Sequence, residues 1–122
     1  MGAYLARIDA LNPTYNAIVS LQSRDGLLAQ ADARDLQLAR REDLGWMHGF
    51  PMAIKDLSDT AGVATTRGSV LLADNVPTQD STMVARMKAA GGIVIGKTNT
   101  PEFGLGSHTC LSRKPWAASS YE

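Results

Sequence analysis

The sequence lacks the features that mark secreted and membrane proteins. It has one cysteine, Cys110, so no disulfide can form within the chain, which favours a reducing compartment. Its apolar runs are all far shorter than the roughly 20 residues that a membrane-spanning helix needs. The first ten residues include Arg7 and Asp9 and lack the apolar core of a signal peptide. We therefore expect a cytoplasmic protein that does not insert into a membrane.

An excess of charge of either sign is also missing. Twelve lysines and arginines balance twelve aspartates and glutamates, so the chain has no broad positive field for phosphate groups, and we expect no nucleic-acid partner. His48 and His108 have no Cys, Asp or Glu at metal-ligand spacing, which predicts loop histidines instead of a metal site. The hydrophobic fraction of 44% and the length of 122 residues are typical of one small globular domain.

Hydrophobic periodicity predicts three helices. Apolar side chains recur at helical spacing over three segments, which are residues 3–12, 26–41 and 81–90. Asn12-Pro13 is expected to stop the first helix, because the residue before a proline disfavours the helical conformation. Asp80 or Ser81 is expected to cap the third helix, and Gly91-Gly92 to end it.

Short runs of β-branched and apolar residues predict strands at three places, which are residues 17–19, 52–54 and 92–96. The order strand, helix, strand from residue 52 to residue 96 is typical of a βαβ unit with parallel strands, so the expected fold class is α/β. Residues 60–80 are rich in Thr, Gly, Ser, Asp and Pro and predict a long, mostly irregular loop. Such a loop in a compact domain is typically either functional or poorly ordered.

The segment from Gly91 to Thr98 fits the phosphate-binding pattern G-x-x-x-x-G-K-[ST], but its neighbours argue against a nucleotide site. A P-loop follows a strand and opens a helix. Here Ile93-Val94-Ile95 favours an extended chain, and the predicted helix precedes the glycines. We interpret the segment as a strand that ends in a glycine. A nucleotide-binding function would instead require a helix that starts near Lys97.

The segment from Gly49 to Asp56 contains a short apolar strand that ends in Lys55. Such a lysine is commonly a solvated strand end, since charged residues are mostly exposed. If the lysine is buried instead, it loses hydration, its pKa falls, and it can act as a neutral base. The segment alone leaves both interpretations open.

Four short strings, taken in order, make the sequence closely resemble the amidase-signature family. The strings are Gly49-x-Pro51-x-Ala53-x-Lys55-Asp56, Thr65-Thr66-x-Gly68-Ser69, Asp80-Ser81-Thr82 and Gly96-Lys97-Thr98-Asn99-x-Pro101-Glu102-Phe103. Residues 7–12 and Asn16-Ala17 also look like that family's N-terminal helix and the segment after it. On this resemblance we expect residues 1–109 to be the N-terminal portion of an amidase domain and residues 110–122 to be a divergent tail.

The resemblance implies a Ser–cis-Ser–Lys triad that hydrolyses linear carbon–nitrogen bonds of amides through an acyl-enzyme. Lys55 matches the family's catalytic lysine, which acts as a base through a bridging serine on a nucleophilic serine. This mechanism needs no metal or organic cofactor, and the substrate of a completed enzyme would be a small-molecule amide. The fold would be the incomplete N-terminal part of the family's mixed sheet flanked by helices, with Lys55 near the loop from Thr65 to Ser69.

In the family, the two catalytic serines lie further from the lysine than Glu122 lies from Lys55. Ser119-Ser120 is flanked by Ala117-Ala118 and Tyr121 instead of the glycines of the family's signature, so we do not assign catalysis to it. We therefore expect this chain alone to be inactive. The alternative function is that of a catalytically inactive fragment, either inert or associated with another chain or with itself through an incomplete sheet.

Other polar and aromatic residues are expected to have structural roles. Lys97 and Glu102 are predicted to pair and to fix the chain after the last strand. Trp46 and Phe50 are predicted to cover the core. Cys110 lies outside the family-like part, and nothing near it in the sequence would activate a thiolate.

Overall fold

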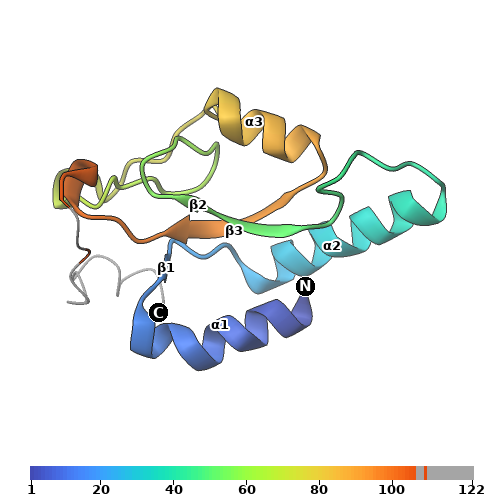
Figure 1. Ribbon diagram of the computed structural model, residues 1–122, viewed down its shortest axis with the longest axis horizontal. Helices are drawn as coiled ribbons and strands as arrows, with labels where there is room; N and C mark the ends of the chain where they lie inside the picture. Colours follow the sequence, from blue (N-terminus) through green and yellow to red (C-terminus); the bar gives the residue numbers. More distant parts are fainter. Residues whose placement is uncertain (107–108, 110–122) are drawn as a thin grey trace.

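The computed structural model describes residues 1–106 and 109, and in it helices cover both faces of one small sheet (Figure 1). The helices and strands, in chain order, are α1 (Gly2–Tyr15), β1 (Ile18–Val19), α2 (Arg24–Ala39), β2 (Pro51–Lys55), α3 (Thr82–Ala89) and β3 (Ile93–Thr98). Two single-turn 3₁₀ helices, η1 (Val70–Leu72) and η2 (Glu102–Gly104), follow β2 and β3. Every predicted helix and strand is present, and the α/β class is confirmed.

The sheet has the strand order β1-β3-β2 and is mixed. The long strand β3 runs parallel to β2 and antiparallel to the two-residue strand β1. In Figure 1, α3 lies on one side of the sheet and α1 and α2 lie on the other. The predicted βαβ unit is therefore present, because β2, α3 and β3 follow one another and the two strands pair in parallel.

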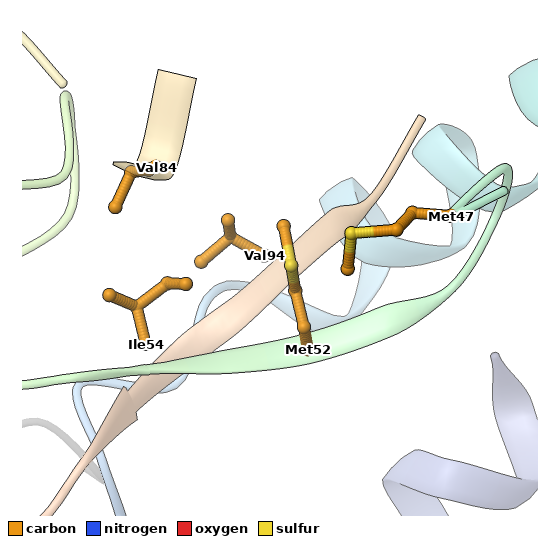
Figure 2. Close-up of a cluster of buried hydrophobic side chains, with 5 residues drawn as sticks. All are labelled: Met47, Met52, Ile54, Val84 and Val94. Atoms are coloured by element: carbon orange, nitrogen blue, oxygen red, sulfur yellow. The ribbon is translucent and has the colours of Figure 1, made fainter. Parts of the chain in front are cut away.

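Two apolar clusters hold the helices to the sheet. On the α3 side, Figure 2 shows the buried side chains of one cluster, which are Met47, Met52, Ile54, Val84 and Val94. On the other side, α1 and α2 contribute Leu5 and Leu27, which pack with Ile93 and Ile95 of β3. Because β3 is covered on both faces, its sequence is a continuous apolar run instead of an alternating one.

A register shift between Met52 and Ala53 interrupts the pairing of β2 with β3. Beyond the shift Ala53 lies opposite Gly96, and Ile54 lies opposite Lys97. An irregularity of this kind re-aims the side chains that follow it. Ile54 belongs to the α3-side cluster, so its partner Lys97 also points to the α3 side of the sheet.

The predicted end of the first helix at Asn12-Pro13 is wrong, because α1 continues to Tyr15 with Pro13 inside it. Pro13 stands in the last turn, where a missing N–H removes only one hydrogen bond of the helix. The Asn12 side chain bonds both the N–H and the carbonyl of Ile18, at 2.8 and 2.9 Å, and so ties this turn to β1. The helix ends when Asn16 adopts a left-handed conformation with φ of 46°.

The prediction for α3 is correct at its C-terminal end and only partly correct at its start. Ser81 occupies the N-cap position, but its side chain makes no capping hydrogen bond, and the Asp80 carboxylate bonds elsewhere. Gly91, with φ of +97°, ends the helix as predicted, and a Cβ there would lie 2.6 Å from His48 Cα. The loop at 60–80 is irregular apart from η1, also as predicted. The predicted tail at 110–122, with Cys110 and Ser119-Ser120, lies outside the described residues.

Candidate active site

Lys55 is the last residue of β2, at the carboxyl end of the strand, as predicted. Its side chain is exposed, whereas those of Met52 and Ile54 are buried on the α3 side. Side chains alternate along a strand, so Lys55 shares the opposite face with Ala53. The exposed lysine has the solvated environment of an ordinary strand end, and the described residues do not bury it.

The residue after Lys55, Asp56, is only 1% exposed and binds the loop that the sequence placed near the site. Its carboxylate accepts hydrogen bonds from the N–H of Thr66 at 2.9 Å, from the Thr66 hydroxyl at 2.5 Å and from the N–H of Gly68 at 3.4 Å. Hydrogen bonds to a carboxylate are stronger than those between neutral groups. These bonds therefore fix the loop from Thr65 to Ser69 beside the end of β2. The residue that holds the loop, Asp56, directly follows Lys55 in the sequence.

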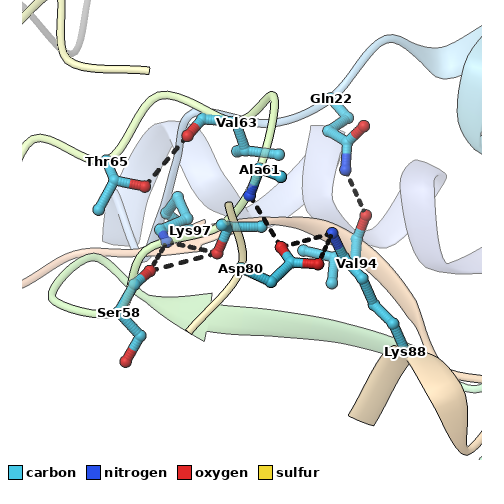
Figure 3. Close-up of polar contacts among 10 residues, drawn as sticks. Gln22, Ser58, Ala61, Val63, Thr65, Asp80, Lys88, Val94 and Lys97 are labelled. Atoms are coloured by element: carbon cyan, nitrogen blue, oxygen red, sulfur yellow. Dashed lines mark hydrogen bonds and ion pairs between the residues drawn. The ribbon is translucent and has the colours of Figure 1, made fainter. Parts of the chain in front are cut away.

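Lys97 is the fully buried lysine of the described chain, with a relative exposure of 0%. Its Nζ donates to the carbonyl of Ser58 (Figure 3). It also donates, at 2.8 Å, to the hydroxyl of Thr60. Burial lowers the pKa of Lys97 to about 8, because a charged amine loses hydration there, and nearby aspartates, foremost Asp56, only partly offset this effect.

The predicted pair between Lys97 and Glu102 is absent. Glu102 instead accepts a hydrogen bond of 2.6 Å from the hydroxyl of Ser69, which is completely buried. The register shift in β2 and β3 explains the difference, since it directs Lys97 toward the α3 side and the turn after β2. The bond from Phe103 N to Arg67 O, at 2.7 Å, holds η2 to the same loop. The chain after β3 is thus fixed as expected, but by different partners.

Asp80 connects the start of α3 to this network (Figure 3). Its carboxylate accepts from Lys88 Nζ at 2.8 and 2.9 Å and from the N–H of Ala61 at 2.8 Å. Burial by itself would raise the pKa of Asp80, but the hydrogen bonds from Lys88 and Ala61 outweigh it and leave the pKa below its usual value. The sequence suggested only a helix cap for Asp80.

These contacts join all four family-like strings at one place, the carboxyl ends of the parallel strands β2 and β3. We call this set the polar cluster; its members are Asp56, Ser58, Thr60, Thr66, Ser69, Asp80, Lys97 and Glu102. Ligands of open α/β sheets bind outside the carboxyl ends of the strands, so this edge is the candidate active site. Sequence reasoning singled out Lys55 here but missed Asp56, although the two are adjacent in the first string.

Other candidates have structural roles or lie elsewhere. The ring of His48 bonds Arg34 O at 2.9 Å and the N–H of Leu44 at 3.1 Å, which fixes the loop before β2. Trp46 and Phe50 are 88% and 57% exposed, so the prediction that they cover the core is wrong, and Met47 is the buried residue of that loop. Within residues 1–106 and 109, no three His, Cys, Asp or Glu side chains are grouped to hold a metal ion.

A surface cavity of about 430 Å³ lies over the loop between η1 and α3. Asp59 and Arg67, which form an exposed ion pair at 3.3 Å, line it together with Asn75. Lys55 is not among its lining residues. The cavity therefore borders the turn and the loop of the candidate site without reaching Lys55, and we do not assign the site's chemistry to it.

The sequence model of the family described as Amidase matches residues 1–115 of the chain. The chain belongs to the amidase family. The resemblance on which Lys55 was chosen is thereby confirmed at the level of the family. The match runs six residues past the predicted boundary at 109, and that boundary stays a prediction.

Curated amidase-family relatives include a glutamyl-tRNA(Gln) amidotransferase subunit of Streptomyces avermitilis, which is 44% identical over 107 residues. That alignment covers 88% of this chain and 21% of the relative. The corresponding subunit of a Roseiflexus species is 44% identical too, over 119 residues that make up 24% of its length. The chain thus spans less than a quarter of the length of these two relatives.

Solved structures of amidases share the fold. The peptide amidase of Stenotrophomonas maltophilia is 35% identical, with a TM-score of 0.76, over 84% of this chain and 21% of that chain. The glutamyl-tRNA(Gln) amidotransferase subunit of Thermotoga maritima is 31% identical, with a TM-score of 0.68, over 86% of this chain and 20% of that chain. In the part of the chain that the structure describes, no helix is both long and apolar enough to cross a membrane.

Proposed function

We propose that this chain supplies the base, Lys55, of an amidase-type hydrolase that cleaves linear carbon–nitrogen bonds of small-molecule amides by a Ser–cis-Ser–Lys mechanism. Lys55 takes a proton, through a bridging serine, from a nucleophilic serine that attacks the amide carbonyl and forms an acyl-enzyme. Water then releases the acid. The two serines come from sequence outside residues 1–109. The mechanism uses no metal or organic cofactor.

The observation that carries this proposal is the position of Lys55. It stands at the carboxyl end of β2, which pairs in parallel with β3, and its neighbour Asp56 binds the loop from Thr65 to Ser69. Two amidase-like segments that are distant in the sequence thus meet beside the exposed amine of Lys55. An amine that is open on one side can receive a serine-bearing segment packed against the carboxyl end of β2.

The test is amide hydrolysis by a chimera. Residues 1–106 of this chain would replace the matched region of the Stenotrophomonas maltophilia peptide amidase, and ammonia release from simple amides would be measured. We expect turnover in the chimera and its loss, on the order of 10⁶-fold, in Lys55→Ala, because triad members act as a unit. Arg86→Ala, which removes an exposed cation of α3, is the matched control and should retain activity.

The chain alone is expected to release no ammonia from the same amides. Turnover by the chain alone that disappears in Ser119→Ala or Ser120→Ala would show that this serine pair is catalytic. A folded chimera whose Lys55→Ala variant turns over normally would refute the role of Lys55.

A second candidate function, association with another chain, is favoured by the surface of the molecule. β2 has a strand on one side only among the described residues, and Trp46, Leu71 and Leu105 are each at least 79% exposed. Unpaired strand edges and exposed apolar side chains mark interaction surfaces. The relatives that are named as amidotransferase subunits agree with such a function.

A cytoplasmic location, which the single cysteine Cys110 suggests, stays a prediction.

The P-loop alternative loses its structural basis. Ile93–Thr98 is a strand, and among residues 1–106 and 109 the only helical turn after Lys97 is the three-residue η2. The Lys97 amine is buried against Ser58 and Thr60 and does not face a phosphate site.

A further inference from the structure

Lys97 is a completely buried lysine that has no role in the proposed chemistry of Lys55. It lies on β3, one residue after Gly96, and points to the α3 side of the sheet, whereas Lys55 lies on the other face. A methionine of similar volume would avoid the cost of burying a charged amine. It would also leave the partners of the amine without a donor. Those partners identify what the lysine does.

The contacts of Lys97 lead directly to Lys55. The Lys97 amine donates to the carbonyl of Ser58, and the N–H of Ser58 in turn donates to the carbonyl of Lys55 at 3.0 Å. Thr60, which is completely buried, accepts from the same amine and donates its hydroxyl to Ser58 O at 3.2 Å. One buried amine thus contacts two residues, Ser58 and Thr60, of the turn that follows the candidate base.

The charges around the amine favour its protonated form. Asp56 from the end of β2, Asp59 from the turn and Asp80 from the start of α3 attract it, while Lys88 of α3 repels it. A protonated amine has three N–H groups and makes stronger hydrogen bonds than a neutral one. While it is protonated, the Lys97 amine can therefore donate to the carbonyl of Ser58 and to the hydroxyl of Thr60 at the same time.

We propose that Lys97 is a positioning residue for Lys55, which ties β3 to the turn from Asp56 to Thr60 and so fixes the end of β2 that presents the base. This inference rests on the proposed function of Lys55. Lys97 itself touches no substrate, and it acts through the main chain of Ser58.

The test measures amide hydrogen exchange in the full chain, with Lys97→Met and Lys97→Arg compared to the wild type. We expect Lys97→Met to raise the exchange rate of the Ser58 amide at least tenfold while the amides of Val94 and Ile95 keep their rates. Lys97→Arg, which retains a cationic donor, should restore most of the protection. Lys88→Met removes the neighbouring cation and is the control that should leave Ser58 protected.

A titration adds a signature that general destabilisation would not produce. The peptide group between Ser58 and Asp59 contains the carbonyl that Lys97 contacts, so the ¹⁵N signal of the Asp59 amide should shift with a midpoint near pH 8 in the wild type. The same step should be absent in Lys97→Arg, because arginine does not lose its proton in proteins.

An unchanged Ser58 rate in Lys97→Met would overturn the proposal, and so would an equal rise at Ser58, Val94 and Ile95. If Lys97→Met does not fold, Thr60→Val provides the test, because it removes one partner of the Lys97 amine. This change should raise the exchange rate of the Ser58 amide at least threefold. An unchanged rate would overturn the proposal. These measurements report how firmly the turn after Lys55 is held and not whether Lys55 acts in catalysis. Failure of the Lys55 function would instead appear only in amide hydrolysis.

Discussion

At the scale of single residues, the structure shows a difference in burial between two lysines that the sequence does not reveal. Lys55 and Lys97 both stand near the ends of apolar strands, yet one is exposed and the other is fully buried. The buried amine is fixed by Ser58 and Thr60, and the exposed one remains open to a further segment. Burial accounts for the lowered pKa of Lys97, so a lowered lysine pKa is not by itself evidence of catalysis.

Burial of Lys97 should make stability depend on pH. Its pKa falls from 10.5 to about 8 on folding, so between these values the unfolded chain binds more protons than the folded one. Stability should therefore rise as the pH increases from 8 toward 10.5, by up to ~3 kcal/mol. Urea unfolding at pH 7.5 and 9.5 measures the free energy of unfolding at both values, and Lys97→Met should lose the increase. An equal increase in the wild type and in Lys97→Met would contradict this prediction.

Asp56 should contribute more to stability than a surface carboxylate. Asp56→Asn would place amide hydrogens against the N–H and hydroxyl donors of Thr66 and Gly68, at a cost of about 1–3 kcal/mol. Asp9→Asn, in the exposed ion pair with Arg24, is the matched control and should change stability by less than about 1 kcal/mol. Chemical unfolding of both variants would decide, and equal effects would show that burial of Asp56 adds nothing.

At the scale of elements, the irregular pairing of β2 with β3 determines which side chains meet. It places Ile54 opposite Lys97 and sends the lysine toward α3. It also brings Gly96 against the chain that follows β1, where a Cβ would lie 2.7 Å from Ser20 O. A glycine is needed at this position because two backbones approach each other closely.

Gly96→Ala should therefore destabilise the sheet. The added methyl group would meet main-chain atoms of Ser20 and Leu21, which can move only if β1 shifts, at a cost of about 1–3 kcal/mol. Gly2→Ala is the control, because a Cβ there meets no atom within 4 Å and alanine favours a helix. Thermal unfolding should show a lower midpoint for Gly96→Ala alone; an unchanged midpoint would mean that β1 moves away freely.

At the scale of the whole molecule, the described chain has a layered arrangement with an open strand edge and exposed apolar side chains. α1, α2 and α3 cover the two faces of β3, while β2 stays at the edge of the sheet (Figure 1). The candidate site lies at the carboxyl end of the same strand, β2. The chain spans about a fifth of the length of the Stenotrophomonas maltophilia peptide amidase.

The chain alone should self-associate. The open edge of β2 can pair with another strand, and Trp46 and Leu71 add exposed apolar surface. Sedimentation should give a mass above the 13.0 kDa of one chain, and the combined Trp46→Lys and Leu71→Lys changes should lower it. A stable monomer at micromolar concentration would refute this expectation.

The sequence by itself determined the elements and their order, because helical and strand periodicity are local properties. It predicted α1, α2, α3 and the strand at 92–96, and four strings sufficed to identify the family. The tertiary structure alone decided that Lys97 bonds Ser58 and Thr60 instead of Glu102, that Trp46 is exposed, and that α1 passes through Pro13. The physical reason is that strand register and burial depend on residues far apart in the chain. One irregularity between β2 and β3 turns a side chain to the opposite face, and no local pattern records it.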